Sequence, residues 1–157
     1  MNDKPNETRI HRGLKGVYFD RSPSTYIDGR AGELRYYGYS IHDLAEHSSF
    51  EETAYLLLHG QLPTAAQLSA FDGLIKAERK LPEAIYDIIR MIKDAHPMDV
   101  LRTAVSALAA FDHETSDCTT EAVLRKGIRL TSLVPMIVAA HHRIRQDEEI
   151  VEPDMTL

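Results

Sequence analysis

The stretch from His96 to Phe111 constrains the fold of this chain more than any other part of the sequence. Pro97 suits the first position of a helix, where its missing N–H costs nothing and its fixed φ is already helical. The polar residues that follow recur with helical spacing and form one narrow stripe: Asp99, Arg102, Thr103 and Ser106. Because the rest of the circumference is apolar or small, the pattern predicts a helix over 97–111 that is buried or lies in a subunit interface.

Composition limits the classes of protein that this sequence can represent. The 157 residues suffice for one domain with a real core, and a hydrophobic content of 43% is typical of globular proteins. A net charge of -6, with no basic block, argues against a nucleic-acid partner. Cys118 is the only cysteine, which excludes an internal disulfide and a cysteine-based zinc site and is typical of a reducing cytosol.

The sequence also lacks the apolar segments that export or membrane insertion would require. The first residues contain no apolar region of the kind found in secretory signals. No apolar run approaches the roughly 20 residues that a membrane-spanning helix needs. We therefore predict a cytoplasmic protein with no membrane partner.

Composition and periodicity divide the chain into four segments. Residues 1–9 are polar and are predicted to form a flexible tail. Residues 10–39 are the least helical part, and two β-prone runs around a glycine-containing turn predict a small hairpin that lies on the helices. Residues 40–146 follow a helical pattern, and 147–157 form an acidic, extended end. The predicted fold class is all-α with a small β-hairpin near the N-terminus.

Capping residues predict where the first helices begin. Ser40, Ser49 and Thr64 are each followed three residues later by an acidic or amide side chain, an arrangement that favours a capping box. The helices that they open are predicted to end near residues 47, 58 and 79. Pro82 is expected at the first position of a fourth helix, which has an isoleucine-rich face.

The last predicted helical segment is the longest. Thr119 or Thr120 is expected to cap a helix that continues to about Gln146. Pro135 lies inside this segment and is expected to kink it or to split it in two.

Three histidines are candidate catalytic or metal-binding residues. His96 precedes Pro97 at a helix start, but no acidic or nucleophilic partner lies at a recognisable spacing, so a capping role is favoured. His141 and His142 are adjacent in a helix and point about 100° apart, so they cannot chelate one ion as an i, i+4 pair does. We interpret them as part of a solvated face, and the sequence predicts no metal site.

Arg12 is the one residue whose surroundings suggest ligand binding. It lies among glycines, beside Gly13 and close to Lys15 and Gly16. An arginine on flexible backbone is a common ligand for phosphate groups. Arg12 is therefore the candidate phosphate-binding residue.

Six short motifs occur in a fixed order along the chain. They are Gly13-Leu14-Lys15-Gly16-Val17, Tyr26-Ile27-Asp28-Gly29, Leu34-Arg35-Tyr36-Tyr37-Gly38-Tyr39-Ser40-Ile41, Ser49-Phe50-Glu51-Glu52, Tyr55-Leu56-Leu57-Leu58-His59-Gly60-Gln61-Leu62-Pro63, and His96-Pro97-Met98 followed by Leu101-Arg102-Thr103-Ala104-Val105-Ser106. This series resembles the N-terminal part of the citrate synthase family, which includes 2-methylcitrate synthases. The resemblance extends over about residues 13–153.

The resemblance implies a mainly α-helical fold and a homodimer. In the family, the helix that matches 97–111, together with the helix before it, packs against its counterparts across the two-fold axis. The expected interface residues are Met98, Leu101, Ala104, Val105 and Leu108. Arg12 matches a family arginine that helps to bind the phosphate of coenzyme A. An apolar face around Leu133, Met136 and Ile137 is expected to lack packing partners in a partial chain, which favours self-association.

The family's reaction is the transfer of an acyl group in the tricarboxylic acid cycle. Its members condense acetyl-CoA with oxaloacetate to give citrate and CoA, or use propionyl-CoA in 2-methylcitrate synthases, and bind no cofactor. The family's catalytic motifs, which include a histidine followed by Asn-Ala-Ser and a His-Gly-Gly-Ala-Asn stretch, do not occur in these 157 residues. We therefore expect an inactive N-terminal fragment that contains no catalytic residue. The alternative is a non-catalytic helical dimerisation module.

Overall fold

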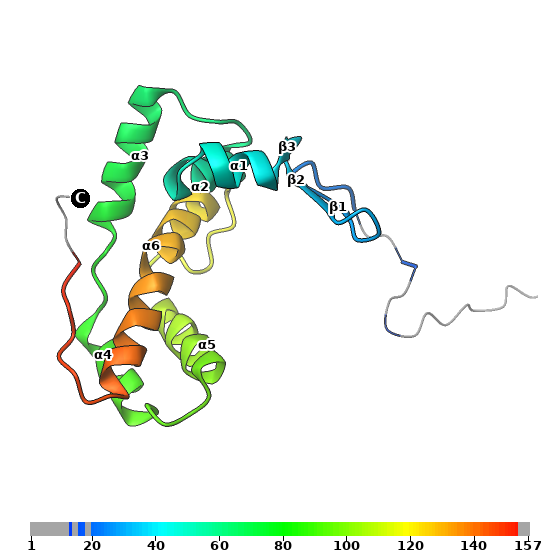
Figure 1. Cartoon of the computed structure of the whole chain (residues 1–157). Coiled ribbons are helices and arrows are strands. Elements are labelled where there is room, and N and C mark those ends of the chain that lie inside the picture. The colour runs from blue at the N-terminus through cyan, green and yellow to red at the C-terminus, as the bar shows by residue number, and fades with distance from the viewer. Residues whose placement is uncertain (1–12, 14–15, 18–19, 154–157) are drawn as a thin grey trace, which may run out of the picture.

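The structure is a computed structural model that describes residues 13, 16–17 and 20–153. Three short strands come first and helices follow. The elements in chain order are β1 (Thr25–Asp28), β2 (Glu33–Tyr36), β3 (Tyr39–Ser40), α1 (Ile41–His47), α2 (Phe50–His59), α3 (Ala65–Ala77), α4 (Glu83–Met91), α5 (Pro97–Leu108), the 3-10 turn η2 (Ala109–Phe111) and α6 (Thr120–Ile144). The predicted fold class, helical with a small β element near the N-terminus, is confirmed (Figure 1).

Two of the three predicted capping boxes are present. At the start of α2, the Ser49 hydroxyl accepts from the Glu52 N–H at 3.1 Å, and the Glu52 carboxylate accepts from the Ser49 N–H at 2.8 Å. Thr64 and Gln67 form the same reciprocal pair at α3. Ser40 instead caps α1 through the His42 N–H alone. These bonds satisfy N–H groups that the first turn of a helix leaves without partners.

The predictions for the later helices need three corrections. Pro82 lies before α4 rather than at its first position, because its ψ of 139° is extended rather than helical. The helix from Pro97 ends at Leu108 and tightens into η2. Pro135 does not divide α6, which runs as one helix of 25 residues from the Thr119 cap.

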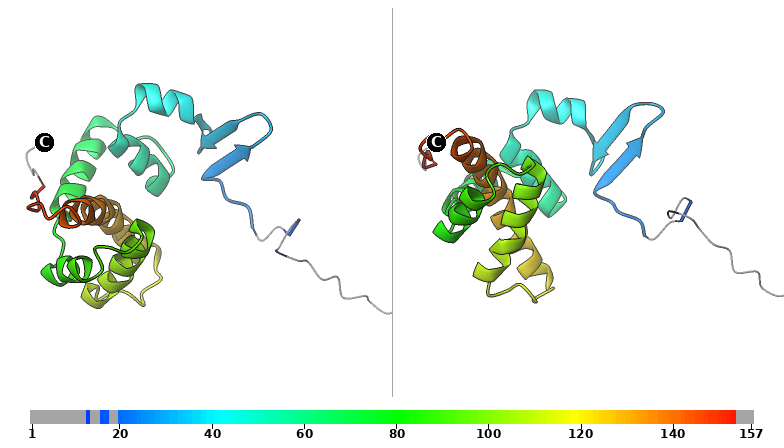
Figure 2. Two further views of the ribbon diagram at one scale, coloured as in Figure 1. Left: turned by 60° about the horizontal axis from the view of Figure 1, so that its bottom comes forward. Right: turned by 90° about the horizontal axis from the view of Figure 1, so that it is seen from below.

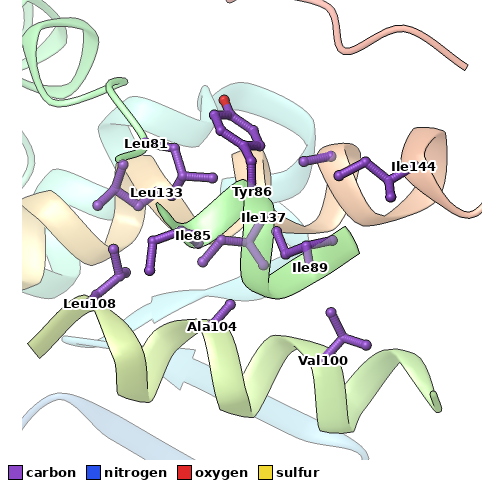
Figure 3. Close-up of a cluster of buried hydrophobic side chains, with 11 residues drawn as sticks. Leu81, Ile85, Tyr86, Ile89, Val100, Ala104, Leu108, Leu133, Ile137 and Ile144 are labelled. Carbon is purple, nitrogen blue, oxygen red and sulfur yellow. The ribbon is translucent and has the colours of Figure 1, made fainter. Parts of the chain in front are cut away.

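Helix α6 is the centre of the fold and packs against α2, α3, α4 and α5 (Figure 1). The larger core cluster joins one face each of α4, α5 and α6, and Figure 3 shows the side chains of α5 pointing toward those of α4 and α6. Its most deeply buried members are Ile85, Ile89, Val100, Ala104 and Ile137, each with no exposed area. These three helices therefore support one another through a continuous apolar core.

A second, smaller cluster joins α2 and α3 to the first half of α6. It contains Tyr55, Phe71, Ile75 and Ile128. The Tyr55 ring stacks on the His59 ring at a centroid distance of 4.0 Å and meets the Phe71 ring edge-on at 5.3 Å. Because α6 takes part in both clusters, it joins the two halves of the helical body.

The three strands form an antiparallel sheet in the order β1-β2-β3. The hairpin prediction is confirmed, whereas β3 was not predicted. The sheet extends away from the helical body, and its contacts with helices are made mainly through α1 (Figures 1 and 2). The expectation that the hairpin lies on the helices is therefore met only at its base. Tyr37 lies at that base and has a positive φ of 46°. Its N–H donates to the Ser24 carbonyl oxygen, and its ring faces Gly60.

Replacing Gly60 by alanine is expected to destabilise the fold by about 1–2 kcal/mol. Gly60 ends α2 with φ 80°, and a Cβ there would lie 3.4 Å from the Tyr37 ring. Gly73→Ala is the matched control, because Gly73 lies inside α3 with nothing within 4 Å of an added Cβ and should gain up to about 1 kcal/mol. Urea unfolding of both variants measures the difference, and equal effects would contradict the role assigned to the Gly60 conformation.

Candidate functional site

The residues predicted to form a subunit interface lie along one face of α5 and range from buried to exposed. Ala104 and Leu108 are buried in the larger core cluster of this same chain. Leu101 and Val105 are partly buried and pack against that cluster from its edge. Met98 is 62% exposed at the start of α5, so it is the member most available to a second molecule.

His96 caps α5, as the sequence analysis favoured. Its Nδ1 atom accepts a hydrogen bond from the Met98 N–H at 3.2 Å, and the side chain is exposed. The geometry is that of a helix cap, with no acidic or nucleophilic group bonded to the ring among the described residues.

The prediction that His141 belongs to a solvated face is wrong. His141 is only 5% exposed, and its Nε2 atom lies 2.9 Å from the carbonyl oxygen of Lys93. It is buried because it shares the core-facing stripe of α6 with Ile137, Ala140 and Ile144. His142 is exposed and lies beside Gln146, so the two histidines do point apart.

Basic side chains of α6 fix the polar loop between η2 and α6. Arg125 bonds Glu114 with two guanidinium nitrogens, and Lys126 donates to the carbonyl oxygens of Thr115 and Asp117. The Arg125 guanidinium holds the pKa of the Glu114 carboxyl below its usual value. This loop is therefore held by charge rather than by apolar packing.

The Arg125–Glu114 pair gives a pH-dependent prediction. Because the pKa of Glu114 is lowered in the folded chain, the pair adds stability above the unfolded pKa and loses it as the pH falls through the folded value. The Glu114→Gln variant should therefore have a lower free energy of unfolding than the wild type at neutral pH. Near pH 2 the two free energies should be equal. Urea unfolding across this range is the measurement, with Glu149→Gln as control. A constant difference at every pH would contradict the assignment.

The remaining candidate residues of the sequence analysis are Arg12 and Cys118. Arg12, the candidate phosphate ligand, lies outside the described residues. Cys118 is exposed in the loop before α6, with its sulfur 3.8 Å from the Ser116 carbonyl oxygen. Within residues 20–153 no group of three or more His, Cys, Asp and Glu side chains is arranged to hold a metal ion. No helix of the described chain is long and apolar enough to cross a membrane.

Sequence reasoning missed a cavity that could bind a small molecule. It has a volume of about 490 Å³ and lies between α6, the end of α3 and the segment Ile150–Pro153. Its polar groups include Arg79 and Tyr86, which come from different elements and share no sequence motif. Pro135 lines the same cavity, and the sequence analysis singled it out only as a proline inside a predicted helix.

These features define a mainly α-helical domain that is organised around one central helix and has a small sheet at one end. The chain belongs to the citrate synthase family, since residues 13–157 match the family model described as citrate synthase, C-terminal domain.

Individual relatives and a solved structure agree with the family assignment. The citrate synthase of Haloferax volcanii is 43% identical over 94% of this chain and 40% of its own length. The 2-methylcitrate synthase 2 of Corynebacterium glutamicum is 38% identical over 94% of this chain and 39% of its own. The Thermoplasma acidophilum citrate synthase, in ternary complex with carboxymethyl coenzyme A and oxaloacetate, has a TM-score of 0.85 at 26% identity over 93% of this chain and 39% of its own. The chain thus spans about 40% of the length of the curated relatives it matches.

Proposed function

We propose that this chain forms the N-terminal helical part of a citrate synthase. In this proposal the complete enzyme is a cytoplasmic transferase of the tricarboxylic acid cycle that condenses acetyl-CoA with oxaloacetate. The observation that carries the proposal is the family match over residues 13–157. The N-terminal assignment rests on the ordered motifs from Gly13 to Ser106, whereas the matched family model is described by the name of a C-terminal domain.

The substrates are proposed from the family and its complexes. A related enzyme has been seen with a coenzyme A derivative and oxaloacetate bound. We propose Arg12 as a ligand of the coenzyme A phosphate, because guanidinium groups bind phosphate in a bidentate manner. Propionyl-CoA in place of acetyl-CoA is the alternative substrate, which is supported by the 2-methylcitrate synthases among the relatives.

A chimera tests whether this chain can serve as part of a citrate synthase. The aligned 40% of the Haloferax volcanii enzyme is replaced by residues 13–153 of this chain. We expect the chimera to release free thiol from acetyl-CoA in the presence of oxaloacetate, and to keep the acyl preference of the Haloferax remainder. The isolated 157-residue chain should give no turnover.

The controls separate folding from function in this experiment. Circular dichroism and sedimentation establish that the chimera is folded, and Arg12→Gln in the chimera should raise the KM for acetyl-CoA more than it lowers kcat. A folded chimera that is inactive with both acetyl-CoA and propionyl-CoA would overturn the proposal. Turnover by the isolated chain would overturn the inference that its residues lack the catalytic groups.

A homodimer that forms through α5 is the second part of the proposal. It is supported by the exposed Met98 and by the partly buried Leu101 and Val105 at the edge of the core. The same surface would serve the alternative function, a non-catalytic helical module that pairs with another subunit. Activity of the chimera distinguishes the two, because a dimerisation module predicts association without turnover.

A further inference from the structure

The cavity beside α6 has the size of a small-molecule site. Its volume of about 490 Å³ falls in the range of roughly 300–1,000 Å³ that is typical of ligand pockets. Ile75, Met136 and Ala140 contribute apolar walls, and small side chains along α6 leave the space open. The cavity is thus large enough for an organic ligand and mostly apolar inside.

Pro135 adds a polar feature to the α6 wall of the cavity. A proline has no N–H, so the carbonyl of Thr131 four residues earlier loses its ordinary helical donor. Thr131 and Pro135 both line the cavity. The hydroxyl of Thr131 is already used, since it donates to the Gly127 carbonyl at 2.8 Å. This carbonyl therefore lacks its usual helical donor at a residue that lines the cavity.

Two arginines line the cavity, and they differ in whether they form an ion pair with a described residue. Arg143 lies 3.2 Å from Glu148 and also donates to the Glu149 carbonyl. Arg79 is half-buried and has no ion pair with any residue of the described chain. The Arg79 guanidinium is therefore the charge that remains available for a ligand.

Tyr86 adds a second hydrogen-bond donor to the lining of the same cavity. Figure 3 shows its hydroxyl pointing away from the apolar cluster, while the ring remains among the buried residues of α4. Burial raises the pKa of Tyr86, and the nearby Glu152 and Glu83 carboxylates raise it further. The phenol therefore keeps its proton at neutral pH and can donate a hydrogen bond.

We propose that this cavity binds a monocarboxylate with an apolar tail, whose carboxylate lies on Arg79 and whose tail covers Met136 and Ala139. A single negative charge matches Arg79, the arginine of this lining that forms no ion pair with a described residue. Glu152 also lines the cavity and repels anions in proportion to their charge, so it disfavours a phosphate dianion more than a monocarboxylate. The proposal does not rest on the proposed enzyme function, because it concerns only groups within residues 75–153.

The other apolar cavity does not offer the same chemistry. It has a volume of about 270 Å³ near Leu108 and Leu133. Its arginine, Arg129, is already held by Glu78 at 3.1 Å and by Asp112 at 3.4 Å. A carboxylate there would have to displace an existing acidic partner.

Calorimetric titration of the 157-residue chain with decanoate tests the proposal. We expect decanoate to bind, and decanol to bind about 10-fold more weakly, because the alcohol cannot form a charged hydrogen bond with Arg79. Arg79→Gln should reduce decanoate affinity by about the same factor and leave decanol unchanged. Arg145→Gln is the matched control, since Arg145 is exposed at the end of α6 and does not line the cavity.

A cavity-filling variant keeps the test decisive if loss of Arg79 perturbs the fold. Ala139 is an exposed α6 residue that lines the cavity, so Ala139→Leu should fold normally and weaken both decanoate and decanol. Absence of decanoate binding to the wild type overturns the proposal. Equal affinities for decanoate and decanol, or an Arg79→Gln affinity equal to that of Arg145→Gln, also overturn it.

Discussion

Ile137→Ala is expected to lower the free energy of unfolding by about 2–5 kcal/mol, the largest effect of any single substitution considered. Ile137 has no exposed area and lies in the cluster where α4, α5 and α6 meet. Removing its outer carbons deletes buried apolar surface and leaves a cavity that rigid neighbours fill only in part. Because domains of this size are stable by about 5–15 kcal/mol, a large share of the fold's stability would be lost.

The adjacent residue provides the control for this prediction. Val138 lies on the outer face of α6 and is 53% exposed, so Val138→Ala should change stability by less than about 0.5 kcal/mol. Urea unfolding followed by circular dichroism gives both values, and Ile137→Val should fall between them. If Ile137→Ala and Val138→Ala had similar effects, the orientation of α6 in the core would be wrong.

Local signals in the sequence were enough to predict most helix starts. Ser49 with Glu52, Thr64 with Gln67, and the Thr119 cap act over three residues, so each can be recognised without knowing the rest of the fold. The end of α5 was harder to predict. Its last turn tightens to 3-10 geometry at residues 109–111, and apolar periodicity does not distinguish that turn from an α-helix.

Tertiary packing decided the features that the sequence analysis missed. The sequence prediction of a solvated face for His141 rests on the argument that adjacent helical histidines point apart and cannot share a metal ion. Its position relative to Ile137, Ala140 and Ile144 instead follows the core-facing stripe, and the Lys93 carbonyl satisfies its ring nitrogen from 48 residues away. That partner cannot be inferred from local sequence.

The expected lack of packing partners around Leu133, Met136 and Ile137 was also wrong. Leu133 is 3% exposed and Ile137 is fully buried, while Met136 packs against the same cluster. The sequence shows that such a face is apolar, but not whether the same chain covers it. Here α4 and α5 cover it, and the apolar surface that remains lies at other positions, such as Met98 and Val138.

The cavity beside α6 escaped sequence analysis for a related reason. Arg79 follows α3, Tyr86 lies in α4, and Pro135 lies in α6, so their proximity depends on how three elements pack. No spacing along the chain connects them. A binding site of this kind becomes visible only when the helices are assembled.

Met98→Glu is expected to weaken self-association of this chain by about 10-fold or more. In the proposed homodimer, Met98 is buried between two copies of α5, and a carboxylate there would lose water without gaining a partner. The fold itself should tolerate the change. Met98 is 62% exposed in the first turn of α5, where a negative charge interacts favourably with the helix dipole.

Sedimentation equilibrium at several concentrations measures this effect, and Val123→Glu provides the matched control. Val123 is 54% exposed near the start of α6, a helix outside the proposed interface, so its replacement should leave association unchanged. A wild-type chain that stays monomeric at all concentrations would contradict the dimer. If Val123→Glu and Met98→Glu weakened association equally, the contact would be a general effect of added charge, and α5 would have no special role in it.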